Sequence, residues 1–497
     1  MPIPRIFSAR TLVCAATLAL AACAVGPNYK RPEAPAVDRY TQQALPAATV
    51  SADTAGGDAQ RFLENQDVPA RWWPTFGNHE LDARVRTALE HSPSIASAQA
   101  ALREARENAG AARGGLFPSL DANVGATRQK YSGSQFGGSG GFVSAPFTVY
   151  NAGVSVGYVF DIFGGVRRGI EAQSALADYQ RAQLDATYLT LAANVVTASL
   201  QEASLREQLR ANEEIAGFQR KELDIAQKQQ QIGAKSLSDT LAVRSQLAVT
   251  EATLPPLRKQ LSATQNQLAT YLGVTPAQLS LQPLTLGAVT LPRDIPVSLP
   301  STLVAQRPDI RAASAQLHSA TAQVGVAVAN MLPQITLSGS LGTQALSAGN
   351  LFSAGTEAWS LGLALAQPLF HGGELLHKKR AAQAGMDKAI ADWQGTVLTA
   401  FQNVADSLQA LQYDAQALAA QTAAEKSAAQ RLDLTRTQYR VGAIDYLNLL
   451  DAERQYQQAL ILLIQARTAR LADTAALYAA LGGGWQDDAS QIASTKK

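Results

Sequence analysis

The stretch "NAGVSVGYVF", residues 151–160, alternates large apolar side chains with small or polar ones. Successive side chains of an extended strand point to opposite faces, so this stretch predicts a strand with one apolar face and one small, polar face. Residues 335–341 and 359–366 alternate in the same way. Each segment has about the length of a tilted strand that crosses a bilayer. A half-buried sheet of a water-soluble protein would have the same pattern.

The strands are expected in two pairs, because polar, glycine-rich loops separate the members of a pair: "SGSQFGGSGGF" at 132–142 and "SAGNLFSAGTE" at 347–357. A sheet of four strands has two open edges. In lipid, each unpaired backbone group at such an edge costs several kcal/mol. Four strands cannot close a barrel, whereas three chains would supply twelve strands around a pore. The small residues would then line the lumen and the apolar residues would face lipid.

The chain contains an internal duplication. Residues 92–125 match residues 307–342, "YVFDIFGG" from Tyr158 matches "LAQPLFHGG" from Leu365, and "QQIGAKSLSDTLAVRSQL" from Gln230 matches "YRVGAIDYLNLLDAERQY" from Tyr439. The common order and the offset of about 210 residues indicate two structural repeats. Each half reads as a helix, two strands and two further helices.

Two stretches without proline, 166–232 and 374–441, predict unusually long helices. Each would run for about 100 Å at 1.5 Å per residue, which is typical of coiled coils. The returning helices are expected in two parts, at 234–272 with 301–330, and at 443–481 with 81–115. An apolar seam with spacings of three and four residues supports this packing: Tyr456, Leu460, Leu463, then Thr474, Tyr478, Leu481.

Cys23 ends the sequence "LAAC", which follows Arg5, Arg10 and a short apolar run. The run is the apolar region of a secretory signal and is too short for a permanent membrane span. "LAAC" resembles a lipobox, at which the signal is cut and the cysteine is acylated. An ordinary signal with an incidental cysteine is the alternative. Ala24, rather than aspartate, follows the cysteine, as in lipoproteins sorted to the outer membrane.

The composition excludes several classes of function. The chain has 42 Lys and Arg against 40 Asp and Glu, so no overall positive charge would attract nucleic acid. No P-loop, HExxH or CxxC pattern occurs, and we expect no enzyme activity and no cofactor. His371, Glu374 and His377 flank a turn, and histidines six residues apart do not share a helix face, so no metal site is expected.

The sequence resembles the TolC-like outer membrane factor family, in the lipoprotein branch often labelled NodT. The resemblance covers nearly the whole mature chain. The residues that carry it are Cys23 with "GPNYKRP"; "WWPTFGNHELDARVRTALEHSP" from Trp72; "FDIFGGVRR" from Phe160; "YLGVTP" from Tyr271; "QRPDIRAA" from Gln306; and "YRVGAIDYLNLLDAERQY" from Tyr439.

The resemblance implies a mainly α-helical fold with a transmembrane β-barrel. Three chains would each give four strands to a twelve-strand barrel, which continues into a long α-helical coiled-coil barrel in the periplasm. The chain would divide into a lipoprotein signal peptide (1–22), a lipidated N-terminal tether (23–77), a first repeat (78–274), an equatorial connector (275–302), a second repeat (303–481) and a C-terminal equatorial tail (482–497). Trp72 and Trp73 are expected either at a membrane interface or, preferably, packed on the equatorial region.

The family also places a gate at the periplasmic tips, here "IGAKSLSD" from Ile232 and "VGAIDYLNLLD" from Val441. Leu447 and Asp451 match gate positions, and Asn448 stands where relatives often have a second aspartate. Ser238 and Asp239 occupy the matching tip of the first repeat, and Tyr439 is a candidate latch. Under threefold symmetry, carboxylates form a ring that attracts cations, and leucines form a ring that closes by dewetting. From spacing alone, a solvated residue beside Arg454 would be the preferred interpretation of Asp451, and the resemblance reverses that preference.

The resemblance therefore implies a passive, trimeric exit duct of a tripartite efflux pump in the bacterial outer membrane, which exports drugs or other small molecules. Cys23 would carry N-palmitoyl and S-diacylglycerol groups. The expected partners are a periplasmic adaptor (membrane fusion) protein and an inner-membrane pump of the resistance-nodulation-division (RND) type. A channel for type I protein secretion is one alternative, and a lipid-anchored periplasmic coiled-coil scaffold without a pore is another.

Overall fold

The computed structural model describes residues 24–130 and 145–483. The chain forms two compact units. Within the described residues, the first consists of 24–32, 102–130, 145–179 and 313–393, and the second of 33–101, 180–312 and 394–483. Each unit therefore combines segments from both repeats.

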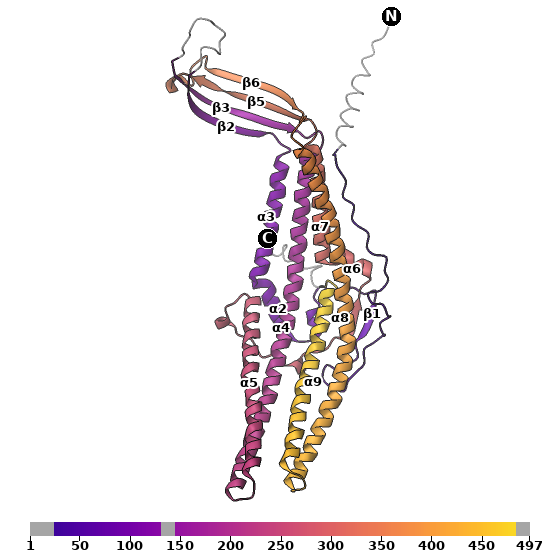
Figure 1. Cartoon of the computed structure of the whole chain (residues 1–497). Coiled ribbons are helices and arrows are strands. Elements are labelled where there is room, and N and C mark those ends of the chain that lie inside the picture. Colours follow the sequence, from indigo (N-terminus) through magenta and orange to yellow (C-terminus); the bar gives the residue numbers. More distant parts are fainter. Residues whose placement is uncertain (1–23, 131–144, 484–497) are drawn as a thin grey trace. The chain divides into compact units, whose positions relative to one another are not determined.

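The first unit contains a four-stranded antiparallel sheet with the order β2-β3-β5-β6 (Figure 1). Its strands are β2 (Ser119–Gln129), β3 (Phe147–Phe160), β5 (Gln334–Ala345) and β6 (Glu357–Ala366). The predicted pairs β2-β3 and β5-β6 are confirmed, and β3 and β5 join the pairs at the centre. The glycine-rich loop at 132–142 lies outside the described residues.

The two faces of the sheet have the predicted chemistry. Phe160, Ile335 and Leu365 lie opposite one another on three adjacent strands, so they form one row of the apolar face. Ser155, Ser340 and Ser360 form a matching row of the polar face, where the hydroxyl oxygens of Ser340 and Ser360 are 2.8 Å apart. The apolar face is uncovered in the single chain: the β6 residues Trp359, Leu361, Leu363 and Leu365 are 67–77% exposed.

The two long helices are α4 (Gly165–Gln231) and α8 (Glu374–Arg440), each of 67 residues. Both agree with the predicted bounds to within one residue. Each is followed by a helix of 35 residues, α5 (Leu237–Tyr271) after α4 and α9 (Tyr446–Ala480) after α8. None of the helices among the described residues has the length and apolarity needed to cross a bilayer.

The remaining helices differ from the prediction in one respect. The stretch 81–115 was expected to be continuous, but the chain forms α2 (His79–His91) and α3 (Pro93–Gly114). The second repeat is broken in the same way, into α6 (Pro300–Gln306) and α7 (Pro308–Ala329). In both cases a proline begins the second helix, because its ring fits the first turn and cannot continue the preceding helix.

An apolar seam of α8 accounts for the packing of the helices in the second unit. Its buried positions follow one another at intervals of four and three residues: Val404, Leu408, Leu411, Ala415 and Leu418, all with no exposed surface. Such spacing keeps one narrow stripe facing the neighbouring helices. The seam predicted on α9 is buried at Leu463, Thr474, Tyr478 and Leu481.

The N-terminal segment is bound to the rest of the second unit. Strand β1 (Arg61–Glu64) pairs in parallel with β4 (Asp294–Val297), which lies in the predicted connector. The buried Gln60 donates hydrogen bonds to the carbonyl of Pro292 and the hydroxyl of Thr474. Trp72 has no exposed surface and stacks on Tyr478 with a ring separation of 5.5 Å. The packed position preferred for the two tryptophans is therefore confirmed.

Candidate functional site

The two helical hairpins, α4-α5 and α8-α9, reverse direction through the same backbone motif. Gly233 and Gly442 adopt positive φ angles of 75° and 77°. After each glycine, the amide of the next residue donates to a carbonyl five residues earlier: Ala234 N to Gln229 O at 2.8 Å, and Ala443 N to Gln438 O at 2.9 Å. This is the hydrogen-bond pattern of a Schellman cap, in which glycine supplies the left-handed residue.

The next helix of each hairpin starts at a side-chain cap. Ser236 and Asp239 form a capping box at the start of α5, so Asp239, predicted at the gate, is hydrogen-bonded within its own turn. At the start of α9, Asp445 accepts hydrogen bonds from the backbone and side-chain nitrogens of Asn448, at 3.0 and 2.7 Å. Two of the predicted gate residues thus stabilise helix starts. The capping role of Asp445 was missed, although aspartate is a common cap.

Three of the predicted residues share one face of α9, because Leu447 and Asp451 are four residues apart and Asn448 and Asp451 are three apart. Leu447 is 61% exposed, and Ser238 on the other hairpin is also exposed. Asp451 does not pair with Arg454. Its Oδ2 accepts a hydrogen bond of 2.7 Å from Nη2 of Arg431 on α8.

That ion pair joins the two helices of one hairpin. Gln455 also donates to Asp451, at 3.0 Å, and contacts Arg431. Arg454 instead reaches across to α5, where its Nε donates to Gln246 at 2.6 Å. The sequence did not indicate Arg431, because α8 and α9 run in opposite directions and spacing along one helix does not identify a partner on the next.

Tyr439 connects the two hairpins. Its hydroxyl accepts a hydrogen bond of 2.9 Å from Nζ of Lys235, which belongs to the first tip. The same ammonium group lies 4.3 Å from the ring centre of Tyr446, and the rings of Tyr439 and Tyr446 meet edge to face at 5.7 Å. One lysine of the first tip therefore contacts two tyrosines of the second hairpin, through a charged hydrogen bond and cation–π attraction.

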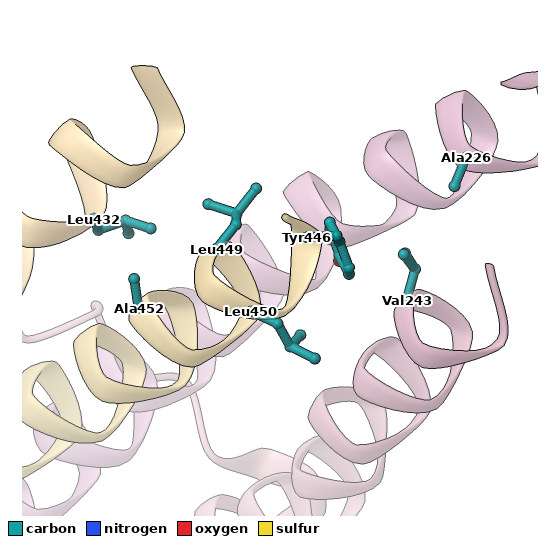
Figure 2. Packing of buried hydrophobic residues seen from close by; sticks show 7 residues of the cluster. All are labelled: Ala226, Val243, Leu432, Tyr446, Leu449, Leu450 and Ala452. Carbon is teal, nitrogen blue, oxygen red and sulfur yellow. The ribbon is translucent and has the colours of Figure 1, made fainter. Parts of the chain in front are cut away.

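A small apolar cluster includes Tyr446 (Figure 2), and Tyr439 packs against it. It draws on all four helices of the two hairpins: Ala226 from α4, Val243 from α5, Leu432 from α8, and Tyr446, Leu449, Leu450 and Ala452 from α9. Every member is at least 94% buried. The cluster holds the tips together by burying apolar surface, which is not directional.

Two carboxyl groups meet between α4 and α9. The carboxyl groups of Glu222 on α4 and Glu453 on α9 lie close enough that each changes the pKa of the other. Burial, and then the charge of Glu453, raise the pKa of Glu222 to about 8. Burial also raises the pKa of Glu453, against the opposing effects of Glu222 and Arg436. Hydrophobic periodicity could not indicate this pair, because it does not show which polar groups meet between helices.

A cavity of about 230 Å³ adjoins this pair. Its lining comes from α4, α8 and α9 and includes Phe218, Arg436, Glu453 and Tyr456. The guanidinium carbon of Arg436 lies 5.4 Å from the ring centre of Phe218.

In the first unit, the residues that follow Cys23 are held by Arg168 of α4. The guanidinium donates to the carbonyl of Val25 at 3.1 Å and to the side chain of Asn28 at 2.6 Å, and it pairs with Glu171 at 2.7 Å. The ring of Tyr29 stacks on His318 at 4.4 Å. We call residues 25–29 with these partners the N-terminal clamp. Cys23 itself lies outside the described residues.

Of the three residues considered in the sequence for a metal site, Glu374 forms an ion pair of 2.5 Å with Lys378, one turn along α8. Within residues 24–130 and 145–483, no group of three His, Cys, Asp or Glu side chains is arranged to hold a metal ion.

A sequence profile of the outer membrane efflux protein family matches residues 85–274 and 299–483. The pyoverdine export outer membrane protein OpmQ of Pseudomonas putida is 31% identical over 443 residues, which cover 88% of this chain and 93% of OpmQ. The solved structure of the outer-membrane channel OprN is 26% identical, with a TM-score of 0.80, and covers 93% of this chain and 100% of its own. The open state of the outer membrane channel MtrE of Neisseria gonorrhoeae is 26% identical, with a TM-score of 0.78, over 93% of this chain and 99% of MtrE.

These similarities confirm the resemblance, the fold class, the efflux function and the outer membrane location that the sequence predicted. The profile covers more than half of the chain and spans both repeats, and the solved channels share the combination of a short sheet with long helical hairpins. The chain belongs to the outer membrane efflux protein family.

Proposed function

We propose that three copies of this chain form one passive exit duct of a tripartite efflux pump, which hydrolyses nothing and exports small molecules. The observation that carries this proposal is the four-stranded sheet, which has one uncovered apolar face and two open edges. Three such sheets would place the apolar face toward lipid and the rows of serine and glycine toward a lumen. OpmQ is named for pyoverdine export, which supports a small-molecule cargo.

The proposed partners follow from the passive character of the proposed duct. A passive duct needs energy from elsewhere, so we assign the energy to an inner-membrane pump of the RND type and the link to a periplasmic adaptor protein. The hairpin tips are the adaptor's proposed docking point. The proposed division of the chain is a signal peptide (1–22), a lipidated tether (23–77), two repeats (78–274 and 303–481), a connector (275–302) and a C-terminal tail (482–497).

The proposed gate is formed by the exposed face of α9. Under threefold symmetry, Leu447 would form an apolar ring and Asp451 an acidic ring, with Asn448 between them in sequence. Ser238 and Asp239 would line the tip of the first hairpin. The Asp451–Arg431 pair is exposed, and exposed ion pairs contribute only about 0–1 kcal/mol. Such a contact can hold a gate and still be released.

Asp451→Ala is expected to raise the conductance of the resting channel severalfold, or to reduce its preference for cations. The substitution removes the acidic ring and the ion pair between Arg431 of α8 and α9. Conductance and reversal potential in planar lipid bilayers measure both effects. Asp224→Ala is the matched control, since Asp224 is also an exposed carboxylate near a tip and pairs with Lys228 within its own helix. Equal behaviour of the two variants would contradict the gate assignment.

A second prediction concerns Tyr439 as a latch between the hairpins. Tyr439→Phe should destabilise the closed tip by about 1 kcal/mol, because it removes the hydrogen bond from Lys235. Lys235→Met should cost more, since it removes this hydrogen bond and also the cation–π contact with Tyr446. The double variant should then cost little more than Lys235→Met alone. Resting conductance and thermal unfolding of the four proteins give the comparison. Fully additive effects would show that the two groups do not act through one contact.

The proposed anchor is an N-palmitoyl, S-diacylglycerol cysteine at Cys23. The N-terminal clamp supports it, because Arg168 fixes the chain only two residues after the cysteine. Cys23→Ser should abolish acylation, detected by mass spectrometry of the mature chain, and leave the trimer intact, because the sheet edges do not depend on the lipid. Loss of the trimer in this variant would show that the lipid is required for assembly.

A further inference from the structure

The contact between Glu222 and Glu453 brings two acidic side chains together, of which Glu453 is buried and Glu222 half-buried. The side chain of Glu453 is 3% exposed. Among the described residues, no amide, amine or hydroxyl group donates to its buried Oε2. Two ionised carboxylates offer only acceptors, so a hydrogen bond between them requires a proton on one. The proton of Glu222 is the donor that this contact has available.

The groups that face the pair come from each neighbouring element. From α8, Nη2 of Arg436 lies 3.4 Å from Oε1 of Glu453. From α9, the Tyr446 hydroxyl lies 3.5 Å from Oε2 of Glu222. Lys235 of the first tip contacts Tyr446 and is a further charged neighbour. The remaining titratable neighbours lie around the cluster and the cavity: Tyr439, Glu214, Asp433 and Tyr456. From α5, the neighbouring residue is the apolar Val243.

One cation therefore reaches the pair directly, and it is closest to Glu453. Arg436 can balance the charge of Glu453, and the proton then remains on Glu222, whose pKa is raised as described above. If this proton left, two negative charges, one buried and one half-buried, would face one guanidinium. Repulsion between them is strong in a medium of low dielectric constant.

We propose that Glu222 and Glu453 form a proton-dependent clasp between the two hairpins: one shared proton holds α9 against α4, and its loss drives them apart. Glu453 follows Asp451 by two residues on the same helix, so a shift of α9 would also move Leu447 and Asp451. This link to channel opening rests on the proposed function. The clasp itself is a property of the helices and does not depend on a pore.

The direction of the pH dependence follows from the raised pKa of Glu222. The contact has its full stability below the ordinary glutamate pKa of 4.5, loses stability as the pH rises toward about 8, and changes little above that value. The tips should therefore be clasped at mildly acidic pH and loosened at alkaline pH.

The test compares the intact protein in lipid nanodiscs with two variants. Glu222→Gln keeps the size of the side chain, donates an N–H to Glu453 and cannot lose its proton in this range. Glu214→Gln is the control, because it removes a carboxylate from the same helix and the same cavity, but from an exposed side chain. Spin labels at two exposed positions, Asp224 on α4 and Gln458 on α9, report the distance between these helices within one chain. Labelled chains are diluted among unlabelled chains so that distances between chains do not contribute.

When the pH is raised from about 6 to about 9, the distance between the two spin labels should lengthen in the unsubstituted chain and in Glu214→Gln. It should stay short in Glu222→Gln. Infrared spectroscopy should detect a protonated carboxyl group that titrates near the pKa of Glu222 and is missing from Glu222→Gln. Asp414 also titrates in this range, because burial and Asp473 raise its pKa to about 7. The infrared band of Asp414 should be present in both the unsubstituted chain and Glu222→Gln, so the difference between the two spectra reports Glu222 alone.

The same lengthening in Glu222→Gln, or the absence of its titration, would overturn the clasp. If Glu222→Gln fails to assemble, Glu453→Gln tests the same point, since it removes the like charge and should also abolish the pH-dependent change. Conductance separates the two proposals. If the distance between the spin labels changes with pH but the conductance does not, the clasp is retained and the gate is refuted. If the clasp titrates in a protein that forms no pore, only the proposed function is refuted.

Discussion

The edges of the sheet are the constraint on which the rest of this molecule depends. In the described part of the chain, β2 and β6 each pair with a neighbour on one side only. Unpaired amides and carbonyls are tolerable in water but cost several kcal/mol each in hydrocarbon. The β6 side chains Trp359, Leu361 and Leu363 are apolar and uncovered, so exposure of this face to water is unfavourable. Further strands would pair the edges while lipid covers the apolar face, and further copies of the chain would supply those strands.

Threefold assembly would give the tips their function. A single Leu447 or Asp451 has little effect on an ion, whereas three copies around an axis form a ring. The contacts that hold the hairpins together are individually modest: an exposed ion pair, one lysine–tyrosine hydrogen bond and one carboxyl pair, together with a small apolar cluster. This combination suits an element that must remain closed and still open when a partner binds, because no single contact dominates.

Much of the fold could be predicted from sequence because its signals are long. The proline-free stretches located α4 and α8 almost to the residue, and alternation located β3, β5 and β6. The duplication is visible in the matched lengths of α3 with α7, α4 with α8, and α5 with α9. The breaks before Pro93 and Pro308 were missed, because apolar periodicity continues across them and the proline effect is local.

The site was less predictable because its contacts join helices that are distant in sequence. The sequence suggested Arg454 as the neighbour of Asp451, but the partner is Arg431 on the antiparallel helix. Asp239 and Asn448 were predicted from their position at the tips, and both take part in helix capping, a role that leaves any part in the gate as a proposal. The carboxyl pair had no sequence signal, because glutamates are usually on the solvated face and only packing shows which ones are buried.

The number of chains in the purified assembly tests this account most directly. Native mass spectrometry of the protein released from detergent or nanodiscs measures it without assumptions about gating. Three chains in each particle, stable only in a membrane or a membrane substitute, would agree with a sheet that is completed by its neighbours. A compact single chain that stays in solution without detergent would contradict it, because the open edges and the apolar face would then need no partner.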